Sequence, residues 1–519
     1  MLGERGLRQH NAAEALCAPV PAESEGEWDD IRAQERATAE SQDVAAGERS
    51  GCQAPLEDES HAGCKGSTVG SNQSWLLLRV GGVYVASILA SGIIFVWPVV
   101  QHHFASAGVF AEFCGSEAAA PGEDGTFSPC SAQDRRLSQV YLVGGNLYLV
   151  AAWPIGVMFD VWGARRTTVF GCVLCCAGGM ALAFSVKMPS TATVLLLPGV
   201  VLCDVGSTMN SFALYGFLWH FHNKQGFLSG LANSTYSVSS VFPLIMFALF
   251  PFELALWILA ALSAVAFVLC ILWVPTSAEY LTTAEHALGY PFERPVFAPK
   301  SVLRSCYYVF VANYEDNTYF SVSLLFMFCS YQYYMAVLWP FTKALFASAS
   351  DADLVAWAGS MVFGTLGFFL SPMVGHLADV LGIKGLIFSM IALNWAFAPF
   401  VFFPSLVLQL VGVVLSTVLA LLQGTYYYRW FALYAPPDLF GNFQGAVCCA
   451  CGLASLLVTV LMQAVFSGLA TYIVPLAILF LLNLGSGFVL AYHILHTQMP
   501  IRPPVEKDEH GRYETTEGI

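Results

Sequence analysis

The sequence predicts an all-α membrane protein with about twelve transmembrane helices in two related bundles of six. Its composition is the first reason: 56% of the residues are hydrophobic and 11% are charged, whereas soluble domains carry about 25% charged residues. The second reason is a set of about twelve apolar stretches long enough to cross a hydrocarbon core of roughly 30 Å as helices. The third is an internal repeat, which predicts an even number of spans.

The repeat joins two runs that each follow a long apolar stretch: GVMFDVWGARR, from Gly156, and GHLADVLGIKG, from Gly375. An offset of 219 residues superimposes Gly156 on Gly375, Asp160 on Asp379, Gly163 on Gly382 and Arg165 on Lys384. A glycine pair recurs with an offset of 215, Gly226 and Gly230 on Gly441 and Gly445, and predicts close helix contact. Two copies in register indicate a duplicated bundle, and such repeats are typical of transporter folds.

The spans follow from the apolar stretches and from the helix length that a bilayer requires. We expect them at residues 76–99, 137–159, 167–186, 194–218, 227–250, 254–275, 320–342, 354–378, 386–403, 405–428, 443–466 and 471–494. The repeat places the first six in an N-terminal bundle, residues 75–275, and the last six in a C-terminal bundle, residues 319–496.

Three polar segments flank the bundles. Residues 1–74 hold fourteen acidic and six basic residues without an apolar core, which predicts a disordered acidic tail. Residues 276–318 contain prolines at 291, 295 and 299 and are expected to form the linker between the bundles. Within this linker, SVLRSCYYVFVANYED is expected either to lie along the membrane surface as a helix or to begin the seventh span early. Residues 497–519 form a second tail.

The distribution of Lys and Arg orients the chain. Beyond residue 74, twelve basic residues fall on the side that holds both termini, and only Arg135, Arg136, Lys187 and Lys343 fall on the other side. Because cytoplasmic loops carry the excess of Lys and Arg, both termini are expected to be cytoplasmic. The formal net charge of −14 belongs mostly to the N-terminal tail and gives no evidence about a substrate.

The loop from Gln101 to Asp134, expected on the outside, contains two cysteines, Cys114 and Cys130. We expect a disulfide between them in that oxidising compartment, with two free thiols as the alternative. Three other cysteines have a metal-like spacing but lie in an apolar stretch without His or carboxylate partners: Cys172, Cys175 and Cys176. They are interpreted as small packing residues, so neither a metal nor a cofactor is expected.

The repeated motif is expected to act at one end of the bundle. Gly163 and Gly382 permit a tight turn, and Asp160 and Asp379 can each cap the next helix. A carboxylate near guanidinium groups at a helix end can also pair in one global state and separate in another, which describes a gate. A fixed topology anchor is the alternative. The candidate gating residues are Gly156, Asp160, Gly163, Arg165, Arg166, Gly375, Asp379, Gly382 and Lys384.

On these motifs the chain resembles the major facilitator superfamily, whose G-x-x-x-D-x-x-G-x-R/K loop follows the second helix and recurs after the eighth. The resemblance covers roughly residues 75–496. Three runs resemble that superfamily's large-neutral-amino-acid branch and the related apicomplexan amino acid transporters: GIIFVWPVVQHHFASAGVFAEFC, QDRRLSQVYLVGGNLYLVAAWPIGVMFDVWGARR and FHNKQGFLSGLANSTYSVSSVFPLIM. Trp162 departs from the superfamily pattern, which often has Arg or Lys there, and this puts the strength of the first gate in question.

The resemblance implies a substrate site near the membrane midplane, on the inner faces of the first, fourth, seventh and tenth helices. Asp204 is a carboxylate deep in the fourth expected span, and such residues are costly in lipid and often functional. It can receive a substrate's ammonium group or bind a coupling proton; a structural bond to a neighbouring helix is the third interpretation. The other candidate substrate-binding residues are Ser87, Ser91, Gly92, Asn210, Ser211, Tyr331, Gln332, Tyr334, Gln423 and Tyr426.

These observations predict a transporter of amino acids, neutral and large or cationic, that works by alternating access as a uniporter or exchanger. Two alternatives stay open: a facilitator of another small solute, such as a monocarboxylate, nucleoside or drug, and an amino-acid sensor that does not transport. An enzyme is not expected, because no nucleophile with a placed base and no phosphate-binding loop was found. The expected partners are the small-molecule substrate and the lipid bilayer, without nucleic acid, and the expected form is a monomer in the plasma membrane.

Overall fold

The computed structural model describes residues 69–90, 92–117, 130–288, 314–346, 348–465 and 470–496, and all regular elements in these ranges are helical. Most of both predicted tails and of the predicted linker lies outside the described residues, as does the candidate Ser91. The boundaries of these segments therefore stay predictions. The first helix does begin within the predicted tail, at Val69.

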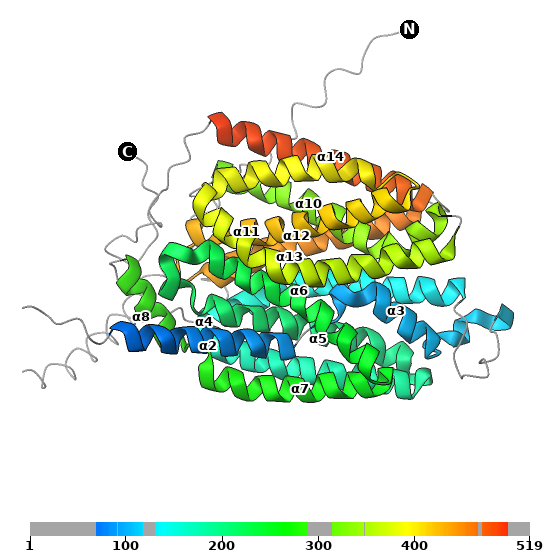
Figure 1. The fold of residues 1–519 in the computed structure, drawn as a ribbon, viewed down its shortest axis with the longest axis horizontal. Helices are drawn as coiled ribbons and strands as arrows, with labels where there is room; N and C mark the ends of the chain where they lie inside the picture. The colour runs from blue at the N-terminus through cyan, green and yellow to red at the C-terminus, as the bar shows by residue number, and fades with distance from the viewer. Residues whose placement is uncertain are drawn as a thin grey trace, which may run out of the picture. The chain divides into compact units, whose positions relative to one another are not determined.

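The helices form two successive sets of six spans (Figure 1). The first half contains α2 (Val69–Leu89), η2 (Ile94–Val96), α3 (Trp97–Ser106), η3 (Ala111–Glu117), α4 (Ser131–Lys187), η4 (Pro189–Thr191), α5 (Ala192–Tyr215), η5 (Leu218–Lys224), α6 (Gln225–Leu249), α7 (Phe252–Trp273) and α8 (Ser277–Leu288). The second half contains α10 (Tyr314–Leu345), α11 (Ala349–Phe400), α12 (Leu406–Tyr434), α13 (Phe440–Val465) and α14 (Ala470–His496).

Two helices, α4 and α11, each supply two spans because a glycine reverses them. Gly163 has φ 81° inside α4, and Gly382 has φ 69° inside α11. This left-handed conformation is strained for residues with a side chain, which explains why both motif copies carry glycine there. The repeated motif therefore marks the hairpin between the second and third spans of each half.

Seven described helices are long and apolar enough to cross a membrane, or eight if the bent α10 counts as one span. Because α4 and α11 each cross twice, and because the shorter α2 and the serine-rich α6 complete the set, the described residues form twelve spans. The predicted fold class, an all-α membrane protein of two six-helix bundles, is confirmed.

The first span differs from its prediction as one helix over residues 76–99. It is broken between Leu89 and Ile94, and it resumes through η2 into α3, which extends to Ser106. Asp204 of α5 stabilises the break, because its carboxylate accepts the backbone N–H groups of Ile93 and Ile94. A side chain in one span thus replaces the helix hydrogen bonds that another span lacks.

The linker segment SVLRSCYYVFVANYED is described only in its last three residues, which belong to the start of α10. These three residues therefore belong to the seventh span, which begins earlier than residue 320. The residues that would form the alternative surface helix lie outside the described part of the chain.

The two halves pack closely through small residues on two pairs of helices. A Cβ atom on Gly156 of α4 would collide with the carbonyl oxygen of Gly441 in α13, and one on Gly445 would collide with that of Ala152. The second pair repeats this arrangement, since Gly226 of α6 faces Gly375 of α11. The glycine pairs singled out by the sequence offset therefore permit close approach of helices from opposite halves.

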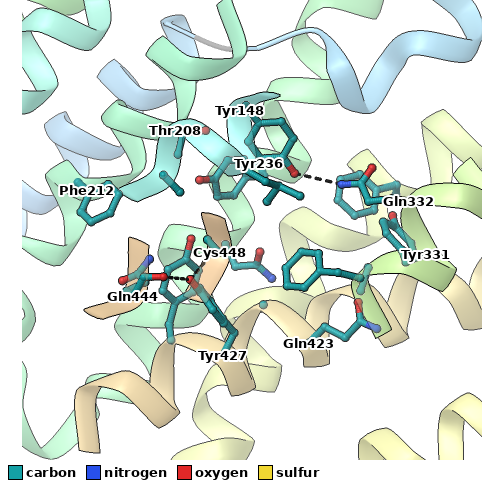
Figure 2. A pocket seen from close by; sticks show the side chains of 18 residues that line it. Tyr148, Thr208, Phe212, Tyr236, Tyr331, Gln332, Gln423, Tyr427, Gln444 and Cys448 are labelled. Atoms are coloured by element: carbon teal, nitrogen blue, oxygen red, sulfur yellow. Dashed lines mark hydrogen bonds between the residues drawn. The ribbon is translucent and has the colours of Figure 1, made fainter. Parts of the chain in front are cut away.

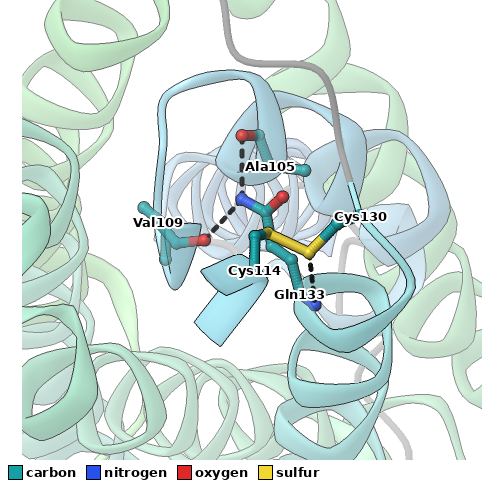
Figure 3. Close-up of a disulfide and its surroundings, with 5 residues drawn as sticks. All are labelled: Ala105, Val109, Cys114, Cys130 and Gln133. Atoms are coloured by element: carbon teal, nitrogen blue, oxygen red, sulfur yellow. Dashed lines mark hydrogen bonds between the residues drawn. A yellow bond between two sulfur atoms is a disulfide. The ribbon is translucent and has the colours of Figure 1, made fainter. Parts of the chain in front are cut away.

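The opposite end of the bundle carries a disulfide between Cys114 and Cys130, the pair indicated by the sequence (Figure 3). Next to it, the fully buried Gln133 donates to the carbonyl oxygens of Ala105 and Val109 at 3.0 and 2.7 Å. The bridge and this amide fasten the end of α3 and the turn after it to the start of α4. We call this the disulfide end, and the end with Gly163 and Gly382 the motif end.

Substituting Gly230→Ala tests the close contact between halves. The added methyl group would collide with the carbonyl oxygen of Ser371 in α11, and overpacking of this kind costs roughly 1–3 kcal/mol. We expect a lower melting temperature of the purified protein. Gly485→Ala is the control, because no atom lies within 4 Å of a Cβ at Gly485; equal melting temperatures of the two variants would contradict the proposed packing.

Candidate functional site

A cavity of about 110 Å³ lies between the two halves, and we call it the central cavity (Figure 2). Its lining comes from α4, α5 and α6 of the first half and from α10, α11, α12 and α13 of the second. The lining residues are Tyr148, Leu149, Ala152, Thr208, Phe212, Asn233, Tyr236, Phe328, Tyr331, Gln332, Phe363, Ala420, Gln423, Gly424, Tyr427, Tyr428, Gln444 and Cys448. Within the described residues this lining contains no Lys, Arg, His, Asp or Glu.

Neutral polar groups link the walls of the central cavity. Gln332 of α10 donates its amide N–H to the hydroxyl oxygen of Tyr148 in α4 at 3.3 Å, which joins the two halves directly. Tyr427 of α12 donates to the carbonyl oxygen of Gln444 in α13 at 2.8 Å. Figure 2 shows both bonds at opposite sides of the cavity.

Two buried amide atoms in the lining have no hydrogen-bond partner within the described residues: Nε2 of Gln423 and Oε1 of Gln444. A buried polar group without a partner costs roughly 1–3 kcal/mol. One is a donor and the other an acceptor, so a ligand that offers both kinds of group would remove both penalties. The tyrosine and phenylalanine rings between them provide an apolar surface.

A second, smaller cavity of about 10 Å³ adjoins the central cavity, and we call it the side cavity. It is lined by Gly92, Ile94, Tyr148, Asp204, Ser207, Thr208 and Tyr236, three of which also line the central cavity. Asp204 is 3% exposed. Its Oδ1 accepts the N–H groups of Ile93 and Ile94 at 3.0 and 3.2 Å. One of its two oxygens therefore makes a structural bond to a neighbouring span, the third of the three roles considered from the sequence.

Five of the predicted binding residues line one of these cavities: Tyr331, Gln332 and Gln423 the central one, and Gly92 and Asp204 the side one. Five others line neither of them: Ser87, Asn210, Ser211, Tyr334 and Tyr426.

Those five predicted residues make local or packing contacts instead. Ser87 donates to the carbonyl oxygen of Val83, and the amide of Asn210 donates to that of Ala90, each at 3.0 Å. Ser211 accepts the hydroxyl of Tyr236 at 2.8 Å and so positions a ring of the central cavity from behind.

The two tyrosines among these five residues pack their rings against other aromatic rings. Tyr334 packs edge-on against Phe397, and Tyr426 packs edge-on against Phe320.

The sequence interpretation missed lining residues from helices outside the four that were considered, among them Tyr148 of α4, Tyr236 of α6 and Gln444 of α13. It also chose Tyr426 in α12, whereas Tyr427 lines the cavity. Helical spacing does not separate the two tyrosines, because residues three and four positions after Gln423 both share its face.

At the motif end, each motif aspartate binds the N-terminus of a helix in the opposite half. Asp160 accepts the backbone N–H groups of Gly441 and Asn442 in α13 at 2.8 and 2.6 Å. Asp379 accepts those of Gly226 and Phe227 in α6 at 2.8 and 2.9 Å. The expectation that each aspartate caps the next helix in its own half is therefore wrong, because close glycine packing brings a different N-terminus within reach.

The basic residues of the motif do not pair with these aspartates in the described residues. Arg165 donates to the carbonyl oxygen of Val274 at 2.7 Å, whereas Arg166 and Lys384 are exposed. A cation from another helix lies near the second aspartate: Arg429 of α12 is 3.9 Å from Asp379 and donates to Gln225 at 2.8 Å. Within the described residues Asp160 has no such ion pair.

Helix α8 fastens the motif end of the first half. Glu279 forms a bidentate ion pair with Arg79 of α2, and the Arg79 guanidinium lowers the pKa of the Glu279 carboxyl. His220 lies 3.7 Å from Glu279, but burial lowers the pKa of its imidazole. Tyr280 of α8 donates its hydroxyl to the carbonyl oxygen of Pro437, just before α13, at 3.4 Å.

No three His, Cys, Asp or Glu side chains among the described residues are grouped as metal ligands. Cys175, from the metal-like spacing, contacts the carbonyl oxygens of Ala90 and Cys203, which are packing contacts.

No protein-family model and no curated protein matches the chain. Among solved structures, the crystal structure of the human organic anion transporter MFSD10 (TETRAN) matches with a TM-score of 0.53. The match covers 80% of this chain and 99% of that chain at 14% sequence identity. This likeness shows the fold: the chain is a multi-pass membrane protein with the major facilitator fold. The resemblance to the large-neutral-amino-acid branch stays a prediction.

Replacing Asp160→Ala tests the cap on α13. The change leaves two backbone donors at the helix N-terminus without their acceptor, so residues 440–445 should exchange amide hydrogen roughly tenfold faster or more. Hydrogen–deuterium exchange measures this directly. Asp351→Ala, in the first turn of α11, should leave exchange in residues 440–445 unchanged. An Asp160→Ala protein with the exchange pattern of the unaltered chain would show that the cap does not hold this end.

Proposed function

We propose that the chain transports amino acids across the membrane by alternating access of its two halves. The observation that carries this proposal is the central cavity, whose walls come from both halves and whose lining carries amide and hydroxyl groups. In a protein of this fold, a site at the junction of two repeats is reached from either side when the halves rock.

Contacts at both ends of the bundle support such a cycle. At the motif end, Asp160 and Asp379 hold helices of the opposite half. At the disulfide end, Lys343 of α10 lies 3.9 Å from Asp134 of α4, which is again a contact between halves. Polar contacts between halves can form in one global state and break in another.

The charge of the cavity favours a neutral or zwitterionic solute. Within the described residues no basic side chain lines either cavity, and the one carboxylate is Asp204. An organic anion, the class named for MFSD10, would lose its hydration without gaining a cation in return, which is costly. An amino acid carries an ammonium group for the acidic side, and its apolar side chain can pack on the rings.

The single carboxylate at the cavities also favours uniport or exchange over a proton relay, which requires a series of ionisable groups. The plasma membrane, cytoplasmic termini and a monomeric state are parts of the same proposal and derive from the family resemblance and the distribution of Lys and Arg.

Reconstitution of the full chain into proteoliposomes tests the function. We expect saturable uptake of at least one proteinogenic amino acid, and little uptake of lactate, uridine or p-aminohippurate. Flux of only the latter solutes would exclude the amino-acid proposal in favour of another solute. Binding of amino acids without flux would indicate a sensor; conversely, a transporter should retain its uptake after removal of residues 1–68, which precede α2.

Two substitutions in the central cavity should weaken substrate binding, because each removes a polar group from a side chain that lines the cavity. Tyr331→Phe and Gln423→Leu should each raise KM by roughly three- to tenfold with normal surface expression. Tyr334→Phe is the matched control: it removes a hydroxyl from the same helix, three residues away, but outside the lining. An equal effect of Tyr334→Phe and Tyr331→Phe on KM would contradict the site.

A further inference from the structure

The two oxygens of Asp204 have different surroundings. Oδ1 accepts two backbone N–H groups where the first span is broken. Oδ2 is buried and has no hydrogen-bond partner within the described residues. The fixed part of the structure therefore uses only one oxygen of this carboxylate, which lines the side cavity, and leaves the second without a hydrogen bond in the described residues.

The lining of the side cavity suits a small positively charged group. Thr208 donates its hydroxyl to the carbonyl oxygen of Asp204 at 2.8 Å, so its own oxygen lone pairs remain acceptors. The volume of about 10 Å³ is close to that needed for one water-sized group. No Lys, Arg or His lines this cavity in the described part of the chain, so the carboxylate has no cation of its own.

The side cavity is a direct neighbour of the larger one, since the two have lining residues in common. Tyr148, Thr208 and Tyr236 line both. A solute can therefore place a compact head group beside Asp204 and the rest of its body among the aromatic rings of the central cavity.

We infer that Oδ2 of Asp204 binds the primary ammonium group of the transported solute, while the apolar part of that solute occupies the central cavity. This inference rests on the proposed function and specifies its substrate class: compact apolar molecules with a free primary amine. An ammonium group provides three donors and a full positive charge, and a charge-assisted hydrogen bond is about twice as strong as a neutral one.

Gly92 keeps this arrangement possible. A Cβ atom at Gly92 would collide with Oδ1 of Asp204 and lie 3.2 Å from the Cβ atom of Ser207. A side chain at this position would displace the carboxylate from the broken span and close the side cavity at the same time.

The test uses the purified full chain and three probes of similar shape: leucine, 3-methylbutylamine, which lacks the carboxylate, and 4-methylpentanoate, which lacks the amine. Asp204→Asn is the informative substitution because the amide oxygen can still cap the broken span, while the charge and the second acceptor are lost. Glu253→Gln, at the start of α7 and outside both cavities, is the matched control. Binding is measured by calorimetry, and folding by the melting temperature.

We expect the unaltered chain to bind leucine and 3-methylbutylamine more tightly than 4-methylpentanoate. Asp204→Asn should weaken binding of the two amines by roughly tenfold or more and leave 4-methylpentanoate unchanged or tighter. Glu253→Gln should change none of the three affinities.

Three results would overturn the inference: equal weakening of all three probes by Asp204→Asn, unchanged leucine binding in that variant, or an unaltered chain that binds neither amine. A proton site, with Asp204→Asn altering only the pH dependence of uptake, would appear as the second result. Leucine uptake into proteoliposomes is followed in parallel. If uptake persists while Asp204→Asn binds leucine normally, the ammonium site fails and the transport function stands; if no amino acid is taken up, the transport function itself fails.

Discussion

The structure depends on two carboxylates that each hold a helix N-terminus of the opposite half. Asp160 and Asp379 can reach α13 and α6 only because glycines let the backbones of these helices come close to α4 and α11. The bond and the close approach require each other, since a side chain at the glycine positions would push the donors away. The close contact of the two halves at the motif end follows from this pairing.

The candidate site combines the neutral central cavity with the side cavity, which contains one carboxylate. Several helices of both halves line the central cavity with amide and hydroxyl groups, which give it directional hydrogen-bonding groups without net charge. The carboxylate of the side cavity is Asp204, which also stabilises the broken first span. The Asp204 side chain thus connects the side cavity with the backbone that leads into α3.

The sequence predicted those features that depend on nearby residues or on the internal repeat. The offset between motif copies located both glycine turns, and cysteine count and position indicated the disulfide. The partner of Asp160 was not predictable, because it lies 281 residues away and packing decides it. Likewise, hydropathy does not reveal that the first span is broken, since the carboxylate that satisfies its free N–H groups belongs to α5. Helical spacing does not separate Tyr426 from Tyr427 either, since both share a face with Gln423, and packing decides that Tyr427 lines the cavity.

At the motif end the two halves touch in two places, α6 against α11 and α4 against α13. These two contacts differ in their dependence on ionic strength. Asp379 has Arg429 at 3.9 Å, with side chains 12% and 20% exposed, whereas Asp160 holds its helix by backbone donors alone in the described residues. Mobile ions weaken an attraction between accessible charges far more than a short bond to buried amides. The contact between α6 and α11 is therefore expected to weaken before the contact between α4 and α13 as the salt concentration rises.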